Sequence, residues 1–298
     1  MSPDRPVPRR IVLAGASGTI GSAVAPQLAA EGHTVTALPR AALADGAALA
    51  AAMAAARPEV VISCIASRSG APKDAEAVDY RANLALLTAA EAAGAGHFIL
   101  LSAICVQKPL LAFQHAKLRF EAALTVSGIG YTIIRPTAFF KSLSGQVARV
   151  KAGKPFLIFG DGHLTRCKPI SDVDLARFIA GCIDNPEALG KVLPIGGPGP
   201  ALSLRDAGEL LFAAAGKAPR FRSVSPAMFT LAGKLLSLGA PFSDWFAEKA
   251  EYARIADYYA TESMLALDPA SGEYSADLTP EFGSETLADH YRRLLAEA

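Results

Sequence analysis

The stretch Gly15-Ala16-Ser17-Gly18-Thr19-Ile20-Gly21 decides the fold. It follows the apolar run RIVLA at 10–14 and precedes an Ala-rich run that predicts a helix over 18–31. Between a strand and a helix, glycines at this spacing permit a tight turn and let the backbone approach a diphosphate. The helix N-terminus adds N–H donors and a partial positive charge. The sequence therefore predicts a dinucleotide-binding turn formed by Gly15, Ser17, Gly18, Thr19, Ile20 and Gly21.

The first half of the chain alternates short apolar strands with helical runs. Strands are expected at 10–14, 34–38, 60–65, 97–102 and 131–135, and helices at 18–31, 46–56, 76–93 and 109–127. Short, almost wholly apolar strands separated by helices are typical of a parallel sheet covered on both faces. We therefore expect an α/β protein with a doubly wound parallel sheet, the Rossmann fold.

The second half predicts a smaller, helix-rich lobe. Turns at 153–162 interrupt the alternation, a last strand is expected at 191–195, and helices are expected at about 172–184, 226–238 and 243–260. On this basis residues 9–140 and 168–197 form the nucleotide-binding domain. Residues 141–167 and 198–298 form a substrate lobe.

Composition excludes several classes of protein. The 298 residues carry 29 Lys and Arg against 28 Asp and Glu, a net charge of +1 that argues against a nucleic-acid partner. No apolar run approaches the roughly 18 residues of a membrane span. The start of the chain lacks the apolar core of a signal peptide, so we expect a cytoplasmic protein. The four cysteines and five histidines show no metal-ligand spacing, which predicts an organic cofactor and no metal.

The end of the second strand indicates which dinucleotide is bound. An NAD site usually has a carboxylate there for the ribose 2′-hydroxyl, whereas this chain has Leu38-Pro39-Arg40. A guanidinium can bind a 2′-phosphate through two hydrogen bonds, so Arg40 favours NADPH over NADH. The alternative is an ordinary surface arginine.

Longer motifs carry a more specific resemblance, and together they cover nearly the whole chain. They are SCIASRSGAPKD at 63–74, HFILLSAICVQKPLLAFQHAK at 97–117, IIRPTAFFKSLSGQV at 133–147, GKPFLIFGDG at 153–162, LPIGGPGP at 193–200 and YYATESML at 258–265. The chain resembles the NADPH-dependent divinyl chlorophyllide a 8-vinyl reductases. These are atypical short-chain dehydrogenases near the isoflavone-reductase-like and NmrA-like groups. The resemblance implies reduction of the 8-vinyl group of a divinyl chlorophyllide or protochlorophyllide to ethyl in chlorophyll or bacteriochlorophyll synthesis.

The ordinary short-chain dehydrogenase motif Tyr-x-x-x-Lys is changed in this chain. The matching positions are Phe113 and Lys117, and phenylalanine has no proton to give. A carbonyl reductase is disfavoured, because a ketone oxygen is protonated as hydride arrives. Hydride addition to a vinyl group leaves a negative charge that can spread into the conjugated macrocycle. Such a reduction therefore needs no proton donor at the position of the usual tyrosine.

Two residues are candidates for catalysis. The family pattern implies that Lys117 binds the nicotinamide ribose, with a second role as a proton source; the alternative is an exposed lysine. Ser102 aligns with the usual catalytic serine, and the alternative is a buried, internally bonded serine. His115 is more consistent with a structural role, because it lies near the opposite face of the helix from Lys117.

Two further segments are expected near the cofactor. Cys64, Ala66 and Ser67 follow the third strand and should line the adenosine-ribose side. Pro136, Thr137 and Phe139 resemble the segment that touches the nicotinamide carboxamide.

The predicted tetrapyrrole substrate is flat and apolar with a carboxylate at one edge. Lys108, Lys141 and Lys168 are candidates for binding that carboxylate. Aromatic residues of the second lobe could supply pocket walls, although plain core is the default for each: Phe139, Phe140, Phe156, Phe159, Phe229, Phe242, Trp245, Phe246, Tyr258 and Tyr259. The apolar helix at 226–238 is favoured as core, and peripheral contact with a membrane is the alternative.

Two rival functions share the glycine turn and the missing tyrosine. One is an NmrA-like NADP-sensing protein without catalysis. The other is an isoflavone-reductase-like enzyme that acts on a phenolic alkene.

Overall fold

Six strands form the central sheet of the computed structural model, which describes residues 7–296. Their order is β2-β1-β3-β4-β5-β8, and the pairings from β2 through β5 are parallel. The bounds are β1 (Arg10–Ala14), β2 (Thr34–Leu38), β3 (Val60–Ser63), β4 (His97–Leu101), β5 (Gly130–Pro136) and β8 (Lys191–Ile195). The doubly wound parallel sheet expected from the sequence is confirmed.

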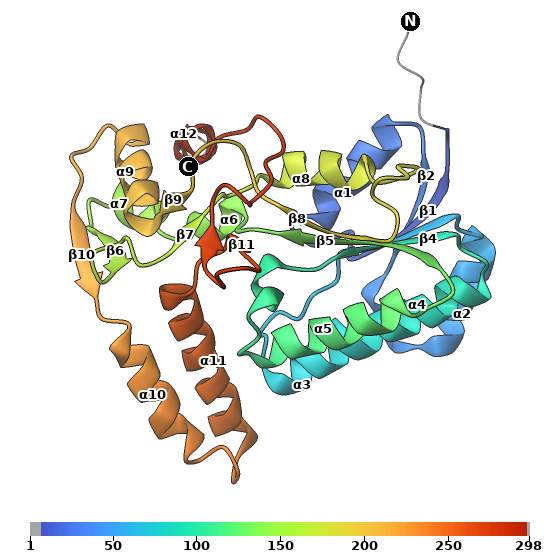
Figure 1. Ribbon diagram of the computed structural model, residues 1–298, viewed down its shortest axis with the longest axis horizontal. Coiled ribbons are helices and arrows are strands. Elements are labelled where there is room, and N and C mark those ends of the chain that lie inside the picture. The colour runs from blue at the N-terminus through green and yellow to red at the C-terminus, as the bar shows by residue number, and fades with distance from the viewer. Residues whose placement is uncertain (1–6, 297–298) are drawn as a thin grey trace, which may run out of the picture. The chain divides into compact units, whose positions relative to one another are not determined.

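Helices cover both faces of this sheet (Figure 1). Helices α1 (Gly21–Ala30) and α8 (Asp172–Ala180) lie on one face, and α2 (Gly46–Ala56), α4 (Asn83–Ala92) and α5 (Ala112–Thr125) lie on the other. Strands β1, β3 and β4 are almost wholly buried, whereas β2 is largely exposed because it lies at the sheet edge. A shared apolar core joins the strands to α2, α4 and α5 through Val12, Met53, Leu86, Phe98 and Phe120.

The strand order reverses between β1 and β3. The chain runs from β1 outward to β2 and then returns to β3 on the other side of β1. Open α/β sheets bind ligands outside the carboxyl ends of the strands at such a switch point. The glycine turn follows β1 and the segment of Cys64 follows β3, so both lie at this switch point.

The helical run expected at 76–93 has a more complex structure. It begins with the short helix α3 (Pro72–Asp74) and continues through η2 (Ala75–Ala82), which is a π-helix, into α4. Two short 3₁₀ segments, η1 (Arg40–Ala44) and η3 (Ile104–Gln107), follow β2 and β4. Helix α5 begins at Ala112, three residues later than expected.

The chain divides into two compact units. The first extends up to Val106 and includes Ala112–Arg135 and Leu175–Leu193. The second comprises Gln107–Leu111, Pro136–Asp174 and the residues from Pro194 onward. The sequence boundaries assign residues 107–111, 136–140, 168–174 and 194–197 to the nucleotide-binding domain, but all four stretches group with the second unit. Backbone hydrogen bonds explain the grouping of 136–140 with 168–174, because Phe140 donates to Ile170 and Ile170 donates to Ala138.

The second unit contains short strands and two groups of helices. Strands β6 (Phe156–Phe159) and β10 (Phe221–Val224) pair in parallel, β7 (Arg166–Cys167) pairs with β9 (Leu202–Ser203), and β11 (Ala266–Leu267) pairs with β12 (Tyr274–Ser275). Its helices are α6 (Phe140–Leu143), α7 (Val147–Lys151), α9 (Leu204–Ala214), α10 (Ala227–Ser237), α11 (Asp244–Thr261) and α12 (Leu287–Ala296). Residues of β6, α9 and α12 form one core around Phe156, Leu211 and Tyr291, and α10 packs against α11.

The turn that joins β1 to α1 depends on glycine at position 21. A Cβ added at Gly21 would lie 2.1 Å from the carbonyl oxygen of Gly15, so Gly21→Ala must displace backbone. We expect it to lower the free energy of unfolding by about 3 kcal/mol or more. Gly46→Ala is the matched control, because nothing lies within 4 Å of its Cβ. It should be neutral or stabilise by about 0.5 kcal/mol. Chemical denaturation measures both, and equal stabilities of the two variants would contradict the packing argument.

Candidate active site at the carboxyl ends of the strands

Three glycines shape the turn after β1, and they do so for different reasons. Gly15 has a φ of +83°, and a Cβ there would lie 2.7 Å from the carbonyl oxygen of Cys64. A Cβ on Gly21 would collide with the Gly15 carbonyl, so protein packing alone requires glycine at both positions. A Cβ on Gly18 meets only that same carbonyl, at 3.2 Å. Of the three glycines, Gly18 is therefore the one that packing within the protein requires least. Glycine at this position is better explained by the close approach of a ligand to the backbone.

Helix α1 begins at Gly21, three residues later than expected. The N–H of Gly18 donates to the carbonyl of Gly15 at 2.9 Å and closes a turn that contains Ser17. Thr19 and Ile20 lie between this turn and the first residue of the helix. A backbone turn without side chains at its closest points, followed by a helix N-terminus, is the geometry that a diphosphate needs. The residues present therefore fit a dinucleotide.

The segment after β3 closes the other side of the switch point. The N–H of Cys64 donates to Ala14 at 2.9 Å, so Cys64 lies directly beside the end of β1. Desolvation raises the pKa of its thiol to about 12, which keeps the thiol protonated and unreactive at neutral pH. Ala66 is exposed and Ser67 is half-buried. These three positions lie where the sequence predicts adenosine-ribose contacts.

Arg40 lies at the carboxyl end of β2, as the first residue of η1, and it is exposed. Its charge acts on Asp74 of α3. Desolvation works to raise the pKa of Asp74, but hydrogen bonds from Ser69 and the charge of Arg40 lower it overall. A cation therefore stands at the end of the second strand without a carboxylate of that strand beside it.

Lys117 is buried, which contradicts the interpretation as an exposed lysine. Its side chain is 10% exposed, and its ammonium lies 2.9 Å from Oδ1 of Asp79, a fully buried carboxylate of η2. The N–H of Ser67 also approaches that oxygen, at 3.4 Å. The structure thus brings Lys117 and Ser67 together through Asp79, which the sequence reasoning missed.

A signal for Asp79 was present in the sequence. Buried positions recur at Ala75, Asp79, Asn83, Leu86 and Ala90 along one helical face. Two polar residues on an otherwise apolar stripe indicate buried polar groups with specific partners. Asn83 confirms this, because it accepts a hydrogen bond of 2.6 Å from buried Ser63.

Ser102 belongs to a different buried network. Its hydroxyl donates to Oε1 of Glu121 at 2.5 Å, and Glu121 is also paired with Arg135. The hydroxyl proton is therefore engaged by a carboxylate, which matches the role of an internally bonded serine. A catalytic role for Ser102 stays a prediction, and this geometry does not support it.

The other positions of the altered motif lie on the same helix as Lys117. Phe113 is half-buried one turn before it, where the ordinary motif has tyrosine, and His115 is exposed. An exposed His115 agrees with the assignment of that residue to the opposite face of α5.

The second unit holds the remaining candidates for cofactor contact. The N–H of Thr137 donates to Ile195 at 2.9 Å and its hydroxyl donates to the carbonyl of Lys168, so Thr137 is buried and fixed. Pro136 is buried and Phe139 is half-buried. Their contact with a nicotinamide stays a prediction.

The candidate lysines Lys108 and Lys168 each pair with a carboxylate. Lys108 lies 2.7 Å from Glu262, and Lys168 lies 2.5 Å from Glu281. A substrate carboxylate at either lysine must compete with this partner. Lys141 is exposed on α6.

The aromatic residues of the second unit divide between core and surface. Phe140, Phe156 and Tyr258 are buried, and Phe159 packs edge-on against Phe229. Exposed apolar side chains gather on α10, the turn after it and α11; they are Met228, Leu231, Leu235, Leu238, Phe242, Trp245, Phe246 and Tyr259. The expectation that helix 226–238 is core is wrong for this face of the helix, although the helix does pack against α11.

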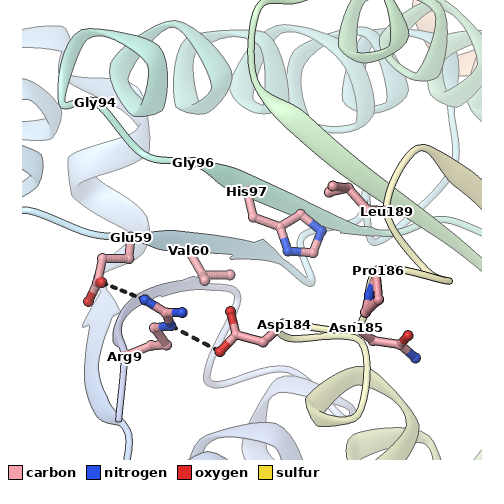
Figure 2. Close-up of a pocket in the computed structure, with 10 residues that line it drawn as sticks. All are labelled: Arg9, Glu59, Val60, Gly94, Gly96, His97, Asp184, Asn185, Pro186 and Leu189. Atoms are coloured by element: carbon pink, nitrogen blue, oxygen red, sulfur yellow. Dashed lines mark hydrogen bonds and ion pairs between the residues drawn. The ribbon is translucent and has the colours of Figure 1, made fainter. Parts of the chain in front are cut away.

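A cavity of about 490 Å³ lies at the opposite, amino-terminal edge of the sheet (Figure 2). Arg9 lies between Glu59 and Asp184, at 3.0 Å from each, and His97 bonds to Thr132. Burial lowers the pKa of His97. The ten residues that line this cavity include none of the predicted site residues, so it is separate from the nucleotide turn.

Within residues 7–296, no cluster of His, Cys, Asp and Glu side chains could hold a metal ion. No helix in that range is long and apolar enough to cross a membrane.

Comparisons with known proteins agree with this geometry. A family described as NAD(P)H-binding matches residues 15–186, a range that begins at the first glycine of the turn. Among solved structures, an NADPH-dependent quinone oxidoreductase of Escherichia coli complexed with NADPH superposes with a TM-score of 0.65. It is 22% identical, and the match covers 96% of this chain and 99% of that one. UDP-glucose 4-epimerase of Thermotoga maritima gives a TM-score of 0.67 at 18% identity, over 96% of this chain and 99% of the epimerase. These structures show the fold.

Curated relatives share much more sequence. The chloroplastic divinyl chlorophyllide a 8-vinyl-reductase of Cucumis sativus is 53% identical over 244 residues, which are 80% of this chain and 58% of that protein. The chain thus spans less than two thirds of that relative. The enzyme of the same name from Oryza sativa subsp. indica is 44% identical over 96% of this chain and 78% of its own length. The chain belongs to the divinyl chlorophyllide a 8-vinyl-reductase family and carries its NAD(P)H-binding domain.

Proposed function

We propose that this protein reduces the 8-vinyl group of a divinyl chlorophyllide or protochlorophyllide to ethyl, with NADPH as the reductant. The observation that carries the proposal is membership of the family at 44% identity over 96% of the chain. The site supports it, because the turn after β1 fits a dinucleotide and the position of the usual catalytic tyrosine holds Phe113.

The chemistry is the addition of one hydride and one proton across a C=C bond. NADPH, when bound, would supply the hydride. The Gly15–Gly21 turn and the N-terminus of α1 bind the diphosphate, and Lys117 donates hydrogen bonds to hydroxyls of the nicotinamide ribose. A ketone would need a proton on oxygen at the same moment, which Phe113 cannot give. A vinyl group conjugated to a macrocycle has no such requirement.

Direct assay tests the proposal against both rivals. The purified protein is mixed with NADPH and divinyl chlorophyllide, and the Soret band and the absorbance of NADPH are followed together. We expect one NADPH oxidised for each pigment molecule, and a product heavier by two hydrogen atoms. Binding of NADPH without turnover would favour the non-catalytic NADP-sensing protein. Turnover of phenolic alkenes alone would favour the isoflavone-reductase-like enzyme.

Two finer assignments accompany the proposal. The exposed apolar side chains of α10 and the following turn support peripheral contact with a lipid surface, where an apolar pigment would partition. A cytoplasmic location stays a prediction, and residues 1–6 at the start of the chain lie outside the described residues.

The preference for NADPH over NADH depends on Arg40. Loss of a charged hydrogen bond to the 2′-phosphate costs about 1.5–3 kcal/mol, so Arg40→Ala should weaken NADPH binding by roughly tenfold or more. NADH affinity should stay unchanged. Arg10→Ala is the matched control, because Arg10 is also exposed but lies at the amino end of β1. Fluorescence titration with both nucleotides measures the ratio, and an unchanged ratio in Arg40→Ala would exclude Arg40 as the discriminating residue.

Turnover depends on Lys117. We expect Lys117→Met to lower kcat by about two orders of magnitude or more, because the ammonium that binds and orients the nicotinamide ribose is lost. His115→Ala, an exposed position on the same helix, should keep the wild-type rate. Steady-state kinetics on the folded variants measure kcat. A wild-type kcat in Lys117→Met would exclude Lys117 from the mechanism.

A further inference from the structure

We propose that Asp79 is the positioning residue of this site: it holds the ammonium of Lys117 in place for the bound nucleotide. The inference rests on the proposed function for the role of Lys117. Its own basis is the contact between the two side chains, both of which belong to the first compact unit.

The geometry of the carboxylate is unusual for a purely structural residue. Asp79 is fully buried, and its Oδ1 lies 2.9 Å from the Lys117 ammonium. Its other oxygen, Oδ2, is buried without any hydrogen-bond partner among the described residues. A buried ion pair often stabilises a fold no better than apolar side chains of similar size, and an unsatisfied oxygen makes this one worse. Stability therefore does not explain Asp79, whereas a functional role for Lys117 does.

The backbone conformation around Asp79 also supports a functional role for this residue. The residue lies in η2, an eight-residue π-helix that interrupts an otherwise ordinary helical run. π-Helical segments are rare and are frequently found at functional sites. The same carboxylate oxygen also approaches the N–H of Ser67 in the segment after β3. Asp79 thus connects Lys117 to the end of β3, beside the glycine turn.

Other charged groups nearby are committed to different partners. Glu76 pairs with Arg81 and Arg119, and Glu121 pairs with Arg135. Among the ion pairs of the described residues, Lys117 is joined to Asp79. Removal of the Asp79 charge therefore leaves the buried ammonium without a carboxylate to hold it.

The experiment is a double-mutant cycle read out as NADPH affinity, without any pigment. We expect Asp79→Asn, which keeps the shape of the side chain, to raise the Kd of NADPH by about tenfold. In a Lys117→Met background the same substitution should change the Kd less than twofold, because Asp79 acts through Lys117. Equal effects of Asp79→Asn in the two backgrounds would overturn the proposal.

A structural control separates positioning from folding. Ser63→Ala removes a neighbouring buried hydrogen bond to Asn83, so it should lower the Tm and leave the NADPH Kd unchanged. The double variant Asp79→Leu/Lys117→Met should have a Tm at or above that of the wild type but bind NADPH weakly. A double variant that binds NADPH as tightly as the wild type would also overturn the proposal.

Kinetics distinguish this inference from the proposed function. If the wild type reduces divinyl chlorophyllide, Asp79→Asn should lower kcat, and Asp79→Glu should restore part of it by returning the charge. If the wild type does not reduce the pigment but NADPH affinity shows the expected coupling, the proposed function fails and the role of Asp79 stands.

Discussion

The close approach of the backbone at the ends of β1 and β3 is the constraint on which the site depends. A side chain at Gly15 would collide with the carbonyl of Cys64, and a side chain at Gly21 would collide with the carbonyl of Gly15. These contacts fix the exit of β1, the start of α1 and the exit of β3 relative to each other. Because the strand order reverses at this point, the same contacts place the N-terminus of α1 at the edge of the sheet where such folds bind ligands.

Two buried charged networks lie on α5 and serve different purposes. Glu121 satisfies both Ser102 and Arg135, so each group has a partner and the network ties α5 to β4 and β5. The Lys117–Asp79 pair leaves one carboxylate oxygen unsatisfied. A buried polar network whose hydrogen bonds are all satisfied rigidifies a core. A network with an unsatisfied buried group is more typical of a functional site. This contrast favours Lys117 over Ser102 as the candidate catalytic residue.

The sequence predicted the sheet well, because its signals are local. The runs at 10–14, 34–38 and 191–195 match β1, β2 and β8 to the residue, since apolar runs bounded by turn residues leave little freedom. The start of α1 was missed because the hydrogen bond from Gly18 to Gly15 extends the turn. The π-helix was missed because ordinary helical periodicity does not reveal a one-residue widening. The short strands of the second unit, such as β6 and β10, pair residues far apart in sequence, which no local pattern reports.

The parts of the site that local sequence motifs encode were also predicted. The glycine turn and Lys117 belong to motifs with fixed spacing, so their positions follow from the sequence. Asp79 has no motif of its own, and its importance depends on a contact with a residue 38 positions away. The role of Ser102 depends on Glu121, whose carboxylate faces inward on α5, and spacing alone does not show which partner a buried serine takes.

The most direct test of the account is the effect of Gly18→Ala on nucleotide binding and stability together. The added methyl group would lie 3.2 Å from the Gly15 carbonyl oxygen, a close contact but a much milder one than the 2.1 Å at Gly21, so the fold should lose far less stability than in Gly21→Ala. If a diphosphate lies against this turn, the same methyl group occupies its place, and the Kd of NADPH should rise by about tenfold or more. An NADPH affinity equal to that of the wild type, in a protein with an unchanged Tm, would contradict the claim that the turn binds the nucleotide.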